Sequence, residues 1–181
     1  GFVVLAVGAW LIRRKNYAAE GKVMLTTTLT LLAVLVPLQI LLGDMHGLNT
    51  LAYQPAKLAA IEAHWNREAR APLTLFAIPD QQNETNHAVI EVPELGSLIL
   101  THSFNGEVPG LKEWPRDQRP PVAIPFFAFR IMVGLGLIML GMVVLSLFLR
   151  LMRMLTSDWY LKLGEWVGPM GFFALIAGWT T

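Results

Sequence analysis

One predicted helix near the middle of the chain carries a cation, a carboxylate and an imidazole. These groups are Lys57, Glu62 and His64, and we expect the helix to run over Pro55–Arg70, because a proline suits the first turn of a helix. Lys57 and Glu62 are five residues apart, about 140° around a helix, so they cannot form the favoured i,i+4 ion pair. Each of the two therefore needs a partner elsewhere, either solvent or a ligand.

A second pair of residues lies in the long apolar stretch 124–149. An arginine such as Arg130 costs at least ~2.5 kcal/mol in a lipid-spanning segment unless it is paired or reaches the interface, so intramembrane charge indicates function by default. Met132 alone fits an ordinary core methionine. Beside a buried cation it becomes a candidate axial haem ligand, with Arg130 facing a haem propionate.

Asp44 lies at the end of another apolar stretch, in the sequence GDMHG. It is either a helix-end carboxylate in water or a proton acceptor at the membrane surface, with His46 nearby. The other histidines, at 64, 87 and 102, lack the spacing of a metal site, and we expect them to be structural or exposed.

A quinol needs a hydrogen-bonding group for its oxygen and a carboxylate or imidazole for its protons, and the predicted helix over Pro55–Arg70 offers both.

The composition indicates an integral membrane protein. The 181 residues are 54% hydrophobic and only 15% charged, whereas a soluble domain is roughly 25% charged. The net charge of +1 gives no bulk attraction for nucleic acid. The absence of cysteine excludes disulfides, thiolate catalysis and Cys-ligated metal sites, but not haem held by histidine or methionine.

Four apolar stretches predict an all-α, polytopic transmembrane bundle of about four helices or part-helices with a large extracytoplasmic loop. A spanning helix needs about 20 apolar residues, so only the second and third stretches are long enough to span alone. The first is about half a span and the last stops inside an apolar run, so we expect an internal fragment of a larger membrane protein. The stretches are 1–12, 23–43, 124–149 and 159–179.

Basic residues set the expected orientation. They cluster in the connections 13–22 and 150–162, and cytoplasmic loops are enriched in Lys and Arg. The segment 44–121, with ten acidic and six basic residues, is then extracytoplasmic. The predicted organisation is 1–43, a truncated helix, a cytoplasmic turn and a spanning helix; 44–121, the external loop; and 122–181, a spanning helix, a cytoplasmic turn and a truncated helix.

The external loop is too long for a passive connector, and we expect it to be ordered and functional. Three short apolar pieces, LTLFAIP, AVIEVP and SLILTHSF, are predicted to form strands or extended segments, because Asn, Pro and Gly punctuate them.

With these residues in view, the sequence resembles subunit I of the cytochrome bd-type quinol oxidases over essentially its whole length. The segment 44–121 corresponds to the quinol-binding loop of that family. The loop is short after Gly110-Leu111-Lys112, and in this respect it resembles the loop of the short-loop branch of the family, which includes cyanide-insensitive oxidases. The other anchors of the resemblance are Gly43-Asp44, KLAAIE at 57–62, FAIPDQQNETN at 76–86, FRIMV at 129–133 and Ala177-Gly178-Trp179.

The resemblance implies a role for each candidate residue. Met132 would be an axial ligand of the low-spin haem b, and Arg130 would interact with that haem. Lys57 and Glu62 would bind and oxidise quinol, with Asp44 as a proton-handling neighbour. Trp179 would approach the high-spin haem region.

The resemblance also implies the reaction of the whole enzyme. Ubiquinol or menaquinol is oxidised outside, and electrons pass through the low-spin haem b to a high-spin haem b and haem d, where dioxygen becomes water, so that charge is separated without pumping. The expected partners are a second large membrane subunit and the bilayer of the bacterial cytoplasmic (inner) membrane. A histidine ligand is expected shortly before Gly1 and a carboxylate ligand shortly after Thr181, so the fragment alone is expected to be inactive.

Two alternatives stay open on the residues themselves. The first is a membrane transporter with an external gating loop, in which Arg130 binds an anionic solute. Transporters are commonly built from repeats, and no repeat is visible in this sequence. The second is a non-catalytic assembly partner.

Overall fold

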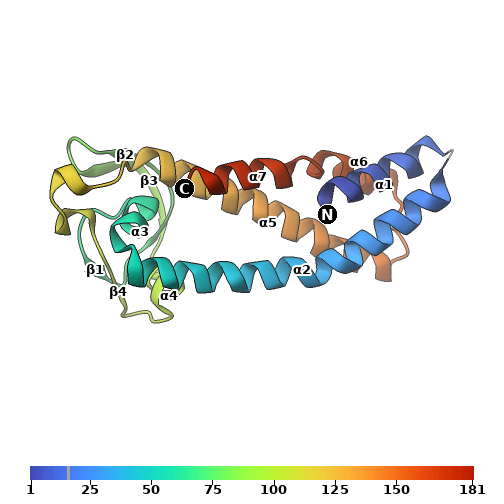
Figure 1. The fold of residues 1–181 in the computed structure, drawn as a ribbon. Helices are drawn as coiled ribbons and strands as arrows, with labels where there is room; N and C mark the ends of the chain where they lie inside the picture. Colours follow the sequence, from blue (N-terminus) through green and yellow to red (C-terminus); the bar gives the residue numbers. More distant parts are fainter. Residues whose placement is uncertain (16) are drawn as a thin grey trace. The chain divides into compact units, whose positions relative to one another are not determined.

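The structure, a computed structural model, describes residues 1–15 and 17–181. It is mostly helical, at 66% helix, which confirms the predicted fold class at this level (Figure 1). The chain divides into two compact units. We call Gly1–Ile40 with Ile131–Trp179 the helical unit, and Leu41–Arg130 with Thr180–Thr181 the mixed unit.

The helical unit is formed from five helices, two of which continue into the mixed unit. The predicted stretch 159–179 is two helices and not one, because Gly168 and Pro169 separate them and a proline has no N–H to donate. The helices are α1 (Phe2–Arg14), α2 (Ala18–Tyr53), α5 (Ala123–Leu151), α6 (Asp158–Val167) and α7 (Met170–Trp179).

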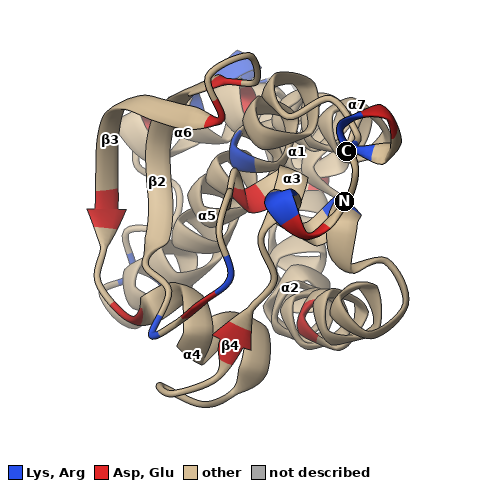
Figure 2. Ribbon diagram, turned by 90° about the vertical axis from the view of Figure 1, so that its left-hand side faces the viewer, with Lys and Arg blue, Asp and Glu red and all other residues tan. Residues whose placement is uncertain are grey.

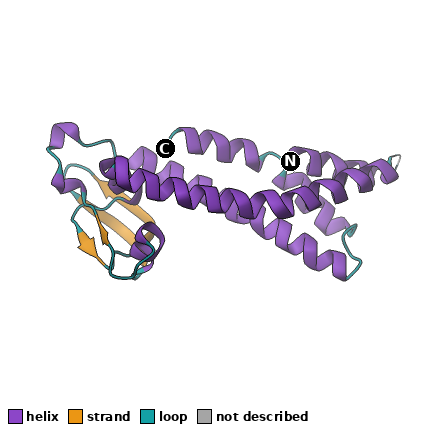
Figure 3. Ribbon diagram, turned by 60° about the horizontal axis from the view of Figure 1, so that its bottom comes forward, coloured by secondary structure: helices purple, strands orange, loops and turns teal. Residues whose placement is uncertain are grey.

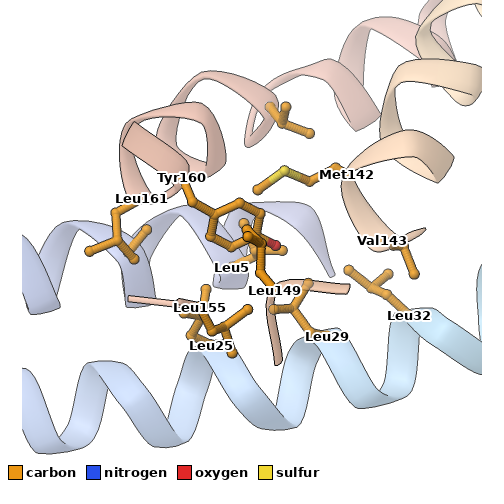
Figure 4. Close-up of a cluster of buried hydrophobic side chains, with 12 residues drawn as sticks. Leu5, Leu25, Leu29, Leu32, Met142, Val143, Leu149, Leu155, Tyr160 and Leu161 are labelled. Carbon is orange, nitrogen blue, oxygen red and sulfur yellow. The ribbon is translucent and has the colours of Figure 1, made fainter. Parts of the chain in front are cut away.

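Leucine side chains and one tyrosine fill the core of the helical unit (Figure 4). Leu5 of α1, Leu25 of α2 and Tyr160 of α6 are fully or almost fully buried there. Glycine lets α1 and α2 approach closely, since a Cβ on Gly21 would lie only 2.7 Å from the carbonyl oxygen of Gly8.

Two helices, α2 and α5, are long and apolar enough to cross a membrane, as the two longest apolar stretches predict. One prediction about α2 is wrong. The helix does not end near residue 43 but continues to Tyr53, so Asp44 lies inside it. Gly43 and Gly47 weaken a helix only modestly, and the next proline is Pro55, so nothing in this stretch stops the helix.

The mixed unit holds all the strands of the described residues (Figure 3). LTLFAIP and AVIEVP are confirmed as strands, and they pair as an antiparallel hairpin. SLILTHSF, expected to be extended, instead begins with a short helix. The elements are α3 (Pro55–Glu62), β1 (Glu68–Ala69), β2 (Leu73–Asp80), β3 (Thr85–Val92), α4 (Leu95–Thr101), β4 (Glu107–Val108) and the 3₁₀ turns η1 (Leu111–Glu113) and η2 (Arg116–Gln118); β1 pairs with β4.

Asp80 fixes the turn of the hairpin. Its carboxylate accepts hydrogen bonds from the backbone N–H groups of Asn83 and Gln82, at 3.0 and 2.9 Å. These bonds, and one from the Asn83 side chain, lower the pKa of Asp80 to about 2. The turn therefore keeps its charged acceptor at any ordinary pH, which holds β2 and β3 in register.

Candidate functional site

The candidate site lies where α3 ends, in the mixed unit. The prediction of a helix over Pro55–Arg70 is wrong, because the helix stops at Glu62. Ala63 takes a left-handed conformation (φ 55°, ψ 36°), and its N–H and that of His64 bond back to the carbonyls of Ala60 and Ala59. This arrangement is a Schellman motif, which caps the helix and turns the chain back on itself.

The turn after α3 is held from two further segments. Asn86 of β3 accepts a hydrogen bond from the indole N–H of Trp65 and donates one to the carbonyl of Ala63, both at 2.9 Å. The backbone N–H groups of Leu111 and Lys112 donate to the carbonyls of His64 and Trp65. The end of α3 is thus fixed by contacts with residues 20 to 50 positions further along the chain.

Arg130 of α5 reaches this end of α3. Its guanidinium donates to the Glu62 carboxylate at 3.2 Å and to the carbonyl of Ile61 at 2.7 Å. It also donates to the carbonyls of Thr74 and Phe126. A guanidinium has five N–H donors, and these contacts use all of them. The charge is also stacked 3.5 Å from the centre of the Phe126 ring.

Glu62 is the buried partner of this arginine, with only 3% of its side chain exposed. Burial raises the pKa of Glu62, and the charges of Arg130 and His64 oppose that rise. A carboxyl with a raised pKa binds and releases a proton closer to neutral pH than an exposed one does. The partner that the structure gives Glu62 is therefore a cation from α5, which the sequence reasoning missed.

Lys57 is on the same helix as Glu62 but is not brought to it. Its side chain is exposed, and in the described part of the chain it has neither a hydrogen bond nor an ion pair. Figure 2 marks the basic and the acidic position that α3 carries. The sequence-based argument that the two cannot pair is consistent with this arrangement, and Lys57 is free to bind an external group.

Asp44 has a histidine partner, but not the one expected. The ring nitrogen Nε2 of His102, just after α4, lies 3.1 Å from its carboxylate, whereas His46 has no such contact with it. Both partners of this pair are partly exposed. The pair lies in the mixed unit, and 38% of the Asp44 side chain is exposed.

Met132 and Trp179 lie in the helical unit. A Cβ on Gly178 of α7 would lie 2.9 Å from the sulfur of Met132, so the glycine leaves the space that this thioether occupies. Trp179 is 83% exposed. Among residues 1–15 and 17–181, no three His, Cys, Asp or Glu side chains form a metal-binding group. The soft donor that fits a haem iron here is the methionine sulfur.

The fold and the site define a membrane-associated helical protein with two membrane-length helices and a buried carboxylate in its mixed unit. The chain belongs to the family described as cytochrome bd terminal oxidase subunit I, whose family model matches residues 1–181. This membership supports the resemblance drawn from the sequence motifs.

Similar proteins come from several bacteria. The chain is 28% identical to cytochrome bd-II ubiquinol oxidase subunit 1 of Escherichia coli (strain K12), over 97% of this chain and 47% of that protein. It is 35% identical to cytochrome bd ubiquinol oxidase subunit 1 of Bacillus subtilis (strain 168), over 76% of this chain and 32% of the relative. It is 29% identical to a putative cytochrome bd menaquinol oxidase subunit I of the same organism, over 98% of this chain and 41% of that protein.

A solved structure also matches. The bd oxidase from Geobacillus thermodenitrificans aligns with a TM-score of 0.87 and 28% identity, over 98% of this chain and 41% of that one. The chain thus spans less than half the length of these relatives. The alignment with the Escherichia coli protein runs over 250 positions, so that relative carries insertions, whereas the alignment with the putative menaquinol oxidase runs over only 187.

Proposed function

We propose that this chain supplies the quinol-oxidising site, and one side of a haem site, of a bacterial quinol:oxygen oxidoreductase of the cytochrome bd type. The single observation that carries the proposal is the buried Glu62 carboxylate, held 3.2 Å from Arg130 at the capped end of α3. Family membership supports the reaction class. Oxidation of a quinol requires a group that takes protons from its hydroxyls, and Glu62 is suited to that task.

Different side chains of this chain have different roles in the proposed oxidation of the quinol. The exposed ammonium of Lys57 donates a hydrogen bond to a quinol oxygen, and Glu62 accepts a proton from the hydroxyl. Arg130 stabilises the carboxylate when the proton leaves, and its bonds to Ile61 and Thr74 keep it in place. Asp44, paired with His102, receives protons at the surface.

Met132 is the residue that would hold the low-spin haem b, through its thioether sulfur. The bound haem would take the electrons of the quinol. Gly178 leaves the space beside α7 that the sulfur of Met132 occupies, and Trp179 would approach the high-spin haem region. The contact of Arg130 with a haem stays a prediction, and it would require a haem group to replace one of the acceptors that its N–H groups have within the mixed unit.

The remaining parts of the proposal concern the whole oxidase. Electrons would pass to a high-spin haem b and haem d, where dioxygen is reduced to water, and protons would be released on the extracytoplasmic side without pumping. The segment 44–121 would face that side, between the membrane segments 1–43 and 122–181 in the bacterial inner membrane. The partners would be ubiquinol or menaquinol and a second large membrane subunit.

The transporter alternative loses its main support. It requires an arginine with donors available for an anionic solute, but each N–H group of Arg130 has an acceptor on this chain. Family membership points to an oxidase instead.

Replacing Lys57 with alanine tests the quinol role of the loop. In the assembled oxidase, Lys57→Ala is expected to raise the KM for quinol about tenfold, the effect of losing about 1.4 kcal/mol of binding from a charged hydrogen bond, while the haem spectra stay unchanged. Lys22→Ala is the matched control. It removes another exposed lysine, near the start of α2, and should leave the KM unaltered. Steady-state quinol oxidation measures both, and an unaltered KM in Lys57→Ala would remove this residue from the site.

A further inference from the structure

The two ring nitrogens of His64 differ in a way that the proposed function does not use. Only 6% of this side chain is exposed. Its Nδ1 lies 3.3 Å from a carboxylate oxygen of Glu68, whereas Nε2 is buried and has no hydrogen-bond partner among the described residues. Buried polar atoms are nearly always bonded, so an exception of this kind calls for a functional explanation.

The contact with Glu68 determines which nitrogen carries the proton. The hydrogen bond from His64 lowers the pKa of Glu68, so this carboxylate is ionised and only accepts. A carboxylate 3.3 Å from Nδ1 favours the proton on that nitrogen, and in the neutral imidazole Nε2 then has a free lone pair. The unpartnered atom is a proton acceptor inside the protein, and its ring is bonded to a group that is about half exposed to solvent.

The capped end of α3 places this acceptor beside the proposed proton acceptor of the quinol. Glu62 is the last residue of the helix, and His64 is the residue whose N–H closes the Schellman motif. The two are close enough for a charge on His64 to lower the pKa of Glu62. Glu62 and His64 are both buried, with 3% and 6% of their side chains exposed, whereas 48% of the Glu68 side chain is exposed.

We propose that His64 and Glu68 carry the proton from Glu62 to solvent; this inference rests on the proposed quinol oxidation. Glu62 takes a proton from a quinol hydroxyl and passes it to Nε2 of His64 through an intervening water molecule, because Nε2 has no direct hydrogen-bond partner among the described residues. Nδ1 of the same ring gives its proton to Glu68, which releases it to water, and the ring returns to the Nδ1–H tautomer before it takes up the second proton. For each quinol, two protons leave in turn and two electrons go to the haem of the oxidase, so only O–H and N–H bonds form and break.

The other charged groups around this path do not compete for it. Arg130 is bonded to Glu62 and to backbone carbonyls. Arg67, on the segment after His64, forms ion pairs with Glu107 and Glu113. Lys112, which follows the residue bonded to the His64 carbonyl, is exposed.

The test is turnover of the assembled oxidase with a soluble ubiquinol analogue, in normal and in heavy water. We expect His64→Gln to lower kcat at least about tenfold, with the KM within twofold of wild type and an increased solvent isotope effect, because proton release becomes rate-limiting. Added imidazole should restore part of the activity of His64→Ala. His87→Gln, which alters an exposed histidine paired with Asp80, is the matched control and should behave as wild type.

The outcomes separate this inference from the proposed function. Unchanged kcat and isotope effect in His64→Gln, with Glu62→Gln inactive, would overturn the relay and leave the quinol site standing. Full activity in Glu62→Gln would instead overturn the quinol site. If His64→Gln does not assemble, Glu68→Gln decides the question at the surface, since the relay requires a lowered kcat there and an unchanged one would contradict it.

Discussion

Replacing Met132 with leucine should remove the low-spin b-type band from reduced-minus-oxidised spectra of the assembled oxidase. Leucine nearly conserves the volume of methionine, so the packing against Gly178 is disturbed by less than about 1.5 kcal/mol. It has no sulfur lone pair, so an iron that uses this ligand loses it. Spectra of isolated membranes, with the remaining haem bands as an internal reference, measure the effect.

Met139 provides a matched control for that substitution. It lies seven residues further along α5, and its sulfur is 3.9 Å from the Cβ position of Gly171 on α7, as that of Met132 faces Gly178. Met139→Leu should leave every haem band in place. A persistent low-spin band in Met132→Leu would mean that another residue ligates this iron.

Replacing Arg130 with alanine should destabilise the mixed unit more than any other single change of a charged residue there. The substitution leaves the buried Glu62 carboxylate unpaired, which costs about 3–5 kcal/mol, and deprives the carbonyls of Ile61 and Thr74 of their donor. We expect faster proteolysis of 44–121 and a lower thermal midpoint of the assembled oxidase. Arg130→Lys should recover only part of the loss, because an ammonium has three donors and not five.

Two further variants distinguish this pairing from a general effect of lost charge. Adding Glu62→Gln to Arg130→Ala should restore stability in part, since the unpaired charge is then gone. Arg67→Ala, which removes an exposed arginine bonded to two carboxylates, should change the thermal midpoint little. Equal losses in Arg67→Ala and Arg130→Ala would contradict a special role for the buried pair.

The long helices could be predicted from the sequence because their signal is local. The runs 23–43 and 124–149 are apolar and long enough to span, and both lie in helices of the structure. The end of α3 could not be predicted in the same way. Ala63 adopts a left-handed conformation that glycine usually provides, and it is held there by Asn86 of β3, more than 20 residues away.

The residues of the candidate site also differ in whether their properties could be predicted from the sequence. Residue type alone identifies Glu62 as a proton acceptor and Arg130 as a costly charge. Their pairing joins residues 68 positions apart, and the contact of Asp44 with His102 joins residues 58 apart, so only the folded loop reveals them. His64 was expected to be structural or exposed; it is buried, with one nitrogen unpartnered, a property that depends entirely on tertiary packing.

Quinol turnover of a Glu62→Gln variant of the assembled oxidase tests the central claim most directly. Glutamine keeps the size of the side chain and an oxygen that accepts from Arg130, but it does not take up a proton. We predict that quinol-dependent oxygen consumption falls at least about 100-fold, the usual contribution of a general base, while the chemically reduced haem spectra stay those of the wild type. Wild-type oxygen consumption with unchanged spectra would contradict the assignment of Glu62 to quinol oxidation.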